Sequence, residues 1–103
     1  MLDQSTDLSA LLNDPGLLTG KAYLAGEWVD APGGKTFDVT NPARGDVIAR
    51  VADLGRADTA RAIEAADTAM KAWAARTAKE RANILRAWYN LMVEHADDLA
   101  TIL

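Results

Sequence analysis

Few side chains in this sequence have the chemistry that catalysis or metal binding needs, and His95 is the first of them. It is the only histidine, and imidazole titrates near neutral pH, so it could act as an acid–base group. No nucleophile stands near it in the sequence, and a histidine at a helix end interacts favourably with the helix dipole. Asp97 and Asp98 could be half of a metal site. Without a second cluster of ligands, they fit better as the solvated first turn of a helix.

The glycines and serines form no catalytic pattern. Gly33, Gly34 and Gly45 match neither G-x-G-x-x-G nor a P-loop, so we expect them to be turn residues. Ser5 and Ser9 are the only serines, and neither stands in a nucleophile-elbow context. The absence of cysteine excludes a disulfide, a thiolate zinc site and a cysteine nucleophile within this chain. The sequence therefore predicts no catalytic, cofactor-binding or metal-binding residue of its own.

The aromatic residues and the net charge bear on possible partners. Trp73, Trp88 and Tyr89 could stack on bases, but they lie at helical spacing, so packing in a core is the better interpretation. A net charge of −4 disfavours a phosphate-binding surface, which needs a basic face. No apolar run approaches the roughly 20 residues of a membrane span, and the N-terminus is unlike a secretory signal. We therefore expect a cytoplasmic protein that binds neither nucleic acid nor membranes.

The element best defined by its sequence is a helix over residues 77–95. It opens with Thr77-x-x-Glu80, a capping box in which the Thr77 hydroxyl accepts from the Glu80 amide and the Glu80 carboxylate reaches back to the Thr77 amide. One face is strongly apolar and requires a packing partner. The residues of this face are Ile84, Leu85, Trp88, Leu91 and Met92.

Two further helices are predicted on either side of it. Residues 57–75 carry an apolar stripe that includes Met70 and Trp73, and the short link at residues 76–77 predicts that this stripe faces Trp88 and Met92. A third helix starts near Ala96, and its apolar stripe is cut off at Leu103 without a cap. The chain is therefore expected to be truncated.

The part before the helices alternates as strands do. A short helix over residues 5–13 is expected to stop at Asp14-Pro15-Gly16. Residues 23–29 then read as one strand, with Tyr23 and Val29 on one face and Leu24 and Trp28 on the other. Residues 30–34 form a turn, residues 36–40 pair with the first strand as a hairpin, and residues 46–52 form a third strand. The prediction is a β-hairpin of three short strands followed by about three helices, an α+β arrangement.

Several stretches carry a recognisable pattern: Leu11-x-x-Asp14-Pro15, then residues 22–31, 34–49, 62–66, 77–88 and 97–100. In this order and spacing they resemble the N-terminal part of aldehyde dehydrogenases. The tract from Thr77 onward is most similar to the succinate-semialdehyde dehydrogenase branch, from which a glutarate-semialdehyde enzyme is hard to distinguish. The resemblance implies an α/β enzyme several times longer. It divides this chain into an N-terminal arm (residues 1–21), a β segment (22–53) and a helical segment (55–103) that packs on the cofactor-binding domain.

The resemblance also implies a reaction. In such enzymes a cysteine thiolate attacks a small aldehyde, hydride passes to NAD(P)+, and a glutamate helps water to release the acid. These groups lie downstream of the region that this chain matches. One position can be carried over: the backbone carbonyls of Val39 and Thr40 match a place where some family members hold a monovalent cation. An ordinary turn at Asn41-Pro42 is the simpler interpretation of the isolated stretch.

Two hypotheses follow. The first is the N-terminal part of an NAD(P)-dependent aldehyde dehydrogenase that oxidises succinate semialdehyde to succinate and is a homo-oligomer when complete. By itself this chain would be inactive and poorly stable, because its helical faces lack the sheet that they should cover. The second is a self-standing α+β interaction or assembly module, which would hide Leu99, Ile102 and Leu103 against a partner. The sequence leaves NAD+ versus NADP+ open.

Overall fold

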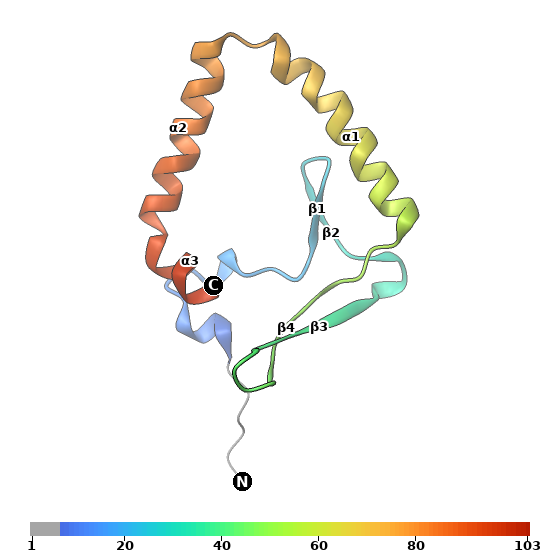
Figure 1. The fold of residues 1–103 in the computed structure, drawn as a ribbon, viewed down its shortest axis with the longest axis vertical. Coiled ribbons are helices and arrows are strands. Elements are labelled where there is room, and N and C mark those ends of the chain that lie inside the picture. The colour runs from blue at the N-terminus through green and yellow to red at the C-terminus, as the bar shows by residue number, and fades with distance from the viewer. Residues whose placement is uncertain (1–6) are drawn as a thin grey trace.

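A computed structural model describes residues 7–103 of the chain (Figure 1). Its elements follow one another as short 3₁₀ turns, four strands and three helices within the described residues. In chain order they are η1 (Leu8–Leu11), η2 (Pro15–Leu17), β1 (Ala22–Leu24), β2 (Glu27–Val29), η3 (Pro32–Gly34), β3 (Thr36–Thr40), β4 (Val47–Ala52), α1 (Arg56–Ala75), α2 (Ala78–Glu94) and α3 (Ala96–Ile102). The α+β arrangement with three helices is confirmed.

The first two strands form a hairpin where the sequence predicted one continuous strand. β1 and β2 pair antiparallel, with Tyr23 opposite Trp28, and the two rings meet edge to face with centroids 5.1 Å apart. The loop is Ala25-Gly26, and both residues have positive φ, of 52° and 85°. Two positive φ values define the tight turn that suits a two-residue hairpin. Because alanine rarely adopts that conformation, alternation through this point was misleading, and the predicted faces of Tyr23 and Trp28 were wrong.

The second pair of strands also differs from the prediction. β3 pairs antiparallel with β4, from Thr36 opposite Ala52 to Thr40 opposite Val47, and the register shifts between Val39 and Thr40. The predicted hairpin between the first strand and residues 36–40 is therefore wrong. The structure contains two separate two-stranded ribbons among its described residues. Each ribbon joins neighbours in sequence, which costs little loop entropy.

Local capping explains where the helices begin. α1 starts after Gly55, whose amide donates to the Asp58 carboxylate at 3.4 Å, and Asp58 also pairs with Arg61. α2 starts after Thr77, whose hydroxyl oxygen accepts from the Glu80 amide at 3.1 Å and donates to the Glu80 carboxylate at 3.0 Å. The predicted capping interaction at the Glu80 amide is confirmed. The return contact runs through the hydroxyl of Thr77 instead of its amide.

The predicted packing of α1 against α2 is wrong. The two helices diverge from the link at Arg76 and Thr77 (Figure 1), and both link residues are extended, with ψ of 151° and 158°. An extended link of two residues aims the second helix away from the first. As a result Met70 is 58% exposed and Trp88 is 59% exposed. The apolar faces of the two helices do not cover each other.

Only a small core is present near the start of the chain. The residue-level exposure falls below a tenth for Leu8, Leu12 and Ala31 among the apolar residues described, and for Asp58 and Asp98 among the charged ones. The accessible surface is 8169 Å², against about 5600 Å² expected for a compact protein of this mass. The radius of gyration is 17.2 Å, against about 13 Å for a compact domain of this length. Most of the exposed large apolar side chains of the described residues lie on α1 and α2.

The first predicted helix is shorter than expected. η1 covers four residues and η2 three, both of the 3₁₀ type. Part of the predicted range, including Ser5, lies outside the described residues. The Asp14 carboxylate accepts from the Gly16 amide at 3.0 Å and starts η2, with Pro15 in its first position. The Asp14-Pro15 pair therefore interrupts the helical path, since the residue before a proline disfavours α conformation.

Candidate functional site

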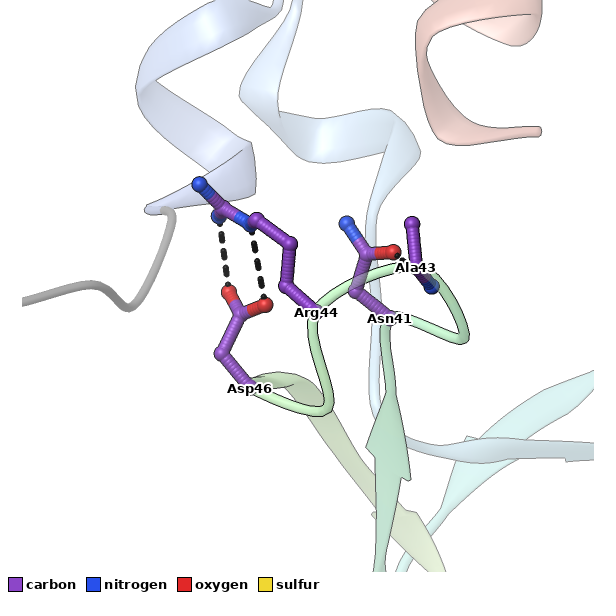
Figure 2. Close-up of polar contacts among 4 residues, drawn as sticks. All are labelled: Asn41, Ala43, Arg44 and Asp46. Atoms are coloured by element: carbon purple, nitrogen blue, oxygen red, sulfur yellow. Dashed lines mark hydrogen bonds and ion pairs between the residues drawn. The ribbon is translucent and has the colours of Figure 1, made fainter.

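The loop between β3 and β4 holds a dense set of polar contacts (Figure 2). The Asn41 side chain accepts from the Ala43 amide at 2.9 Å, and the Asn41 amide donates to the Asp46 carbonyl at 2.8 Å. Arg44 reaches over the loop and binds Asp46 through two nitrogens, at 3.2 and 3.0 Å (Figure 2). Gly45 supplies the positive φ, of 80°, that closes the turn. These contacts make the loop a rigid connection, because a bidentate pair fixes both partners.

This loop lies next to the predicted cation position. Val39 and Thr40 are the point where the β3–β4 register shifts, so regular ladder pairing is interrupted at the carbonyls in question. No group of three or more His, Cys, Asp or Glu side chains gathers as a metal site in residues 7–103. A cation held by the backbone carbonyls of Val39 and Thr40 would not need such a cluster of side chains, so the cation position stays a prediction. The turn at Asn41-Pro42 is built by the Asx contact and needs no ion to explain it.

A second polar cluster joins the two ends of the described chain. The Asp98 carboxylate accepts from the backbone amides of Asn13 and Asp14, each at 2.8 Å, and Asp98 is 4% exposed. These two hydrogen bonds hold the pKa of Asp98 below its ordinary value, against the opposing effect of burial and with a smaller contribution from His95. The prediction that Asp98 lies in a solvated turn is wrong. Sequence reasoning missed this contact because its partners are 85 and 84 residues away.

His95 lies where two helices meet. It is the C-cap of α2, and its amide donates to the Leu91 carbonyl at 3.0 Å. It is also the N-cap of α3, and its carbonyl accepts from the Leu99 amide at 2.9 Å. The side chain is half-buried beside Asp97 and Asp98. The predicted place at a helix C-terminus is confirmed. No cysteine or serine stands within this cluster, which is formed by Asn13, Asp14, Glu94, His95, Asp97 and Asp98.

The remaining candidates are placed as follows. Gly33, Gly34 and Gly45 all have positive φ and open space around them, so their predicted role in turns is confirmed. Trp88 and Tyr89 are 59% and 53% exposed, so core packing of these two residues within this chain was a wrong prediction. An open hollow of about 770 Å³ lies between the β1–β2 hairpin and α1, with mostly apolar walls. None of the helices in the described residues is long and apolar enough to cross a membrane.

The polar contacts of the β3–β4 loop and of Asp98 hold the backbone in place and pair opposite charges. Arg44 with Asp46 and Asp58 with Arg61 are paired, and Asp98 is engaged by two amides. A general base needs a proton donor within hydrogen-bond reach, and a nucleophile needs an adjacent base. Among the described residues a hydroxyl meets a carboxylate at Ser9 with Asp7, at 2.7 Å, and at Thr77 with Glu80, at 3.0 Å. Both contacts are exposed, and the second belongs to the cap of α2. The conspicuous surfaces of the described residues are the exposed apolar faces of α1 and α2.

Comparison with known proteins identifies the family. The model of the aldehyde dehydrogenase family matches residues 28–103. The chain therefore belongs to the aldehyde dehydrogenase family, and the resemblance read from its motifs is confirmed.

The chain is also similar to particular members of this family. The chain is 54% identical over 92 residues to glutarate-semialdehyde dehydrogenase of Pseudomonas aeruginosa, and 53% identical over 92 residues to the NADP(+) succinate-semialdehyde dehydrogenase of Escherichia coli. Each alignment covers 89% of this chain and 19% of the relative. The crystal structure of succinate-semialdehyde dehydrogenase from Burkholderia pseudomallei superposes with a TM-score of 0.83 at 49% identity, covering 88% of this chain and 19% of that one. The chain thus spans about a fifth of the length of these relatives.

Proposed function

We propose that this chain is the N-terminal segment of an NAD(P)-dependent aldehyde dehydrogenase that oxidises succinate semialdehyde to succinate. The proposal rests on sequence identity: over 92 residues, more than half of the positions are identical to those of relatives named as semialdehyde dehydrogenases. Glutarate semialdehyde is the competing substrate, because a relative named for it is as similar as the one named for succinate semialdehyde. The name of the Escherichia coli relative specifies NADP(+), which supports a nicotinamide cofactor for the whole enzyme.

The role of this segment in such an enzyme is structural. The sequence holds no cysteine, so the thiolate that the family resemblance implies must come from another part of the protein. We propose that α1 and α2 cover the cofactor-binding region with their apolar faces. Leu85, Trp88 and Leu91 are each between 51% and 59% exposed, and removing such side chains from water is the main driving force for packing. The complete enzyme is proposed to be a cytoplasmic homo-oligomer.

The first experiment is the intact mass of the protein purified from its source cells. A mass several times 11.0 kDa supports the proposal that these residues are part of a longer enzyme. A mass of 11.0 kDa favours the second candidate, a small interaction or assembly module. The specific observation behind that candidate is the same set of uncovered helical faces, which a partner protein could bury.

Activity is then measured on the purified protein at its natural length. We expect reduction of NAD+ or NADP+, followed at the nicotinamide absorbance, on addition of succinate semialdehyde, and weaker reduction with glutarate semialdehyde. The 103-residue chain expressed alone is the matched control and should be inactive. Equal kcat/KM for the two semialdehydes would contradict the substrate assignment, and oxidation by the isolated chain would contradict the structural role of this segment.

A further inference from the structure

The segment between η1 and β1 is in contact with elements that are far apart in the sequence. At its first end, η1 lies against α3, and Leu8 and Leu12 are 8% and 7% exposed. Immediately after η1, the amides of Asn13 and Asp14 donate to the two separate oxygens of the Asp98 carboxylate. Apolar burial and two charge-assisted hydrogen bonds therefore act together at this end.

The other end of the segment is held by β4. The Gly20 carbonyl accepts from the Ala52 amide at 2.7 Å. A Cβ atom on Gly20 would lie 2.3 Å from the Arg50 carbonyl oxygen, so the two backbones approach as closely as only glycine permits. Leu8 also borders a small hollow together with Ile48 and Arg50 of β4, so the segment is beside this strand at more than one position.

Within residues 7–103, the hydrogen bonds from α3 to residues outside it go to this segment, to His95 and to Leu103, and none goes to the β3–β4 ribbon. The path along the chain from β4 to α3 runs through α1, the link at Arg76 and Thr77, and α2 (Figure 1). The two long helices leave their apolar faces uncovered, so they do not brace each other. The segment connects the two ends of this path, because it contacts α3 at one end and β4 at the other (Figure 1).

We propose that residues 8–20 are a strap that fixes α3 relative to the β3–β4 ribbon, and that Asp98 is the positioning residue that fastens it. The strap is released at the α3 end when Asp98 loses its negative charge or one of its oxygens. Its attachment at Gly20 is independent of Asp98 and persists. The proposal does not depend on the catalytic function of the whole enzyme.

Other charged groups at the fastening do not replace Asp98. The cluster around it contains Asp14, Glu94, His95 and Asp97. Asp14 caps η2 with its own carboxylate, and Asp97 is exposed on the first turn of α3. The only cation of the cluster, when protonated, is His95, which favours the ionised form of Asp98. The carboxylate of Asp98 alone accepts from both strap amides.

The test is amide hydrogen exchange at Asn13 and Asp14 in the protein at its natural length, with substitutions introduced at its chromosomal locus. Asp98→Asn replaces one acceptor oxygen by an amide group, which places two donors face to face. We expect both strap amides to be affected, with at least tenfold faster exchange at one of them. Asp97→Asn removes the same charge from the same helical turn and should change neither amide by more than twofold. The Ala52 amide, bonded to Gly20, should keep its rate in both variants.

Two results would overturn the proposal. Equal exchange at Asn13 and Asp14 in the Asp98→Asn and Asp97→Asn proteins would show that the Asp98 oxygens do not fasten the strap. If Asp98→Asn does not yield folded protein, the unmodified protein decides the question. There both amides should exchange at least tenfold more slowly than amides of an unstructured peptide, and unprotected amides would refute the strap directly.

Discussion

Gly20→Ala is the substitution for which the structure makes the sharpest prediction. A Cβ atom at this position would be 2.3 Å from the Arg50 carbonyl oxygen and 3.4 Å from the Arg50 carbonyl carbon. Both are backbone atoms of β4, which is paired with β3 and cannot rotate aside as a side chain can. The methyl group must therefore push the strap away from the strand by about 1 Å to reach an ordinary contact distance of about 3.4 Å.

That displacement determines how strongly Gly20→Ala weakens the contact between the strap and β4. The hydrogen bond from Ala52 to the Gly20 carbonyl, now 2.7 Å, would lengthen beyond useful range. Overpacking of a well-fitted contact costs about 1–3 kcal/mol. Since every 1.4 kcal/mol is a tenfold change in an equilibrium constant, opening of the strap at β4 should become about 5- to 150-fold more frequent.

The assay is hydrogen exchange of the Ala52 amide in the protein at its natural length, in the regime where exchange reports the opening equilibrium. Gly55→Ala is the control, because an added Cβ there meets nothing within 4 Å and its φ of −92° suits any residue. This control should leave the Ala52 rate unchanged.

An unchanged Ala52 rate in the Gly20→Ala protein would refute the reasoning, since it would mean that strap and strand have room for the methyl group. Equal acceleration by Gly20→Ala and Gly55→Ala would do so as well, because the effect would then be unrelated to the close approach at Arg50.

Three further predictions concern the ends of helices and strands. Thr77→Ala removes the cap of α2 and should cost about 1 kcal/mol, seen as about fivefold faster amide exchange in the first turn of α2, whereas Thr77→Ser should keep the cap. Amide hydrogen bonds lower the pKa of Asp98 below its ordinary value of 3.8, so the stabilising effect of Asp98 is complete above pH 3.8 and is lost as the pH falls through the lower folded pKa. Hydrogen exchange at Asn13, corrected for intrinsic rates, should therefore be constant around neutral pH and become faster only in acid. Faster exchange already near pH 6 would contradict this. Tyr23→Ala should destabilise the β1–β2 hairpin by about 0.2–1 kcal/mol through loss of the ring contact with Trp28, whereas Tyr23→Phe should preserve it, as measured by exchange across the hairpin.

The helices were predictable because their signals are local. Thr77-x-x-Glu80 places the start of α2, and the apolar stripe over residues 57–75 places α1 within one residue of its observed start at Arg56. Both features depend on residues three or four positions apart. The turn glycines were predictable for the same reason, since positive φ is a property of the residue itself.

The pairing of strands was not predictable from the same reasoning. Alternation through Ala25 and Gly26 continues as if the strand were unbroken, and only the two positive φ values turn the chain. The partner of β3 was then assigned to the wrong side, because turn signals precede it at residues 32–34 and follow it at residues 41–45. Which of two flanking turns closes a hairpin depends on geometry that composition does not encode.

The contact at Asp98 shows a different limit in the candidate site. An acidic residue in the first turn of a helix is explained locally by the helix dipole, so nothing in its neighbourhood calls for a distant partner. Its actual partners are backbone amides, which every residue other than proline possesses. The side chain at Asn13 therefore gives no indication of the contact, and the family resemblance did not predict it either.

The two-residue link between α1 and α2 has a mechanical consequence. A helix of 17 residues is about 25 Å long, so a change of about 10° in the direction of α2 at Thr77 moves its far end by about 4 Å. Such an angle requires only modest rotation about the four backbone dihedrals of Arg76 and Thr77. A small torsional change at the link would therefore displace the opposite end of α2 by more than the length of a hydrogen bond.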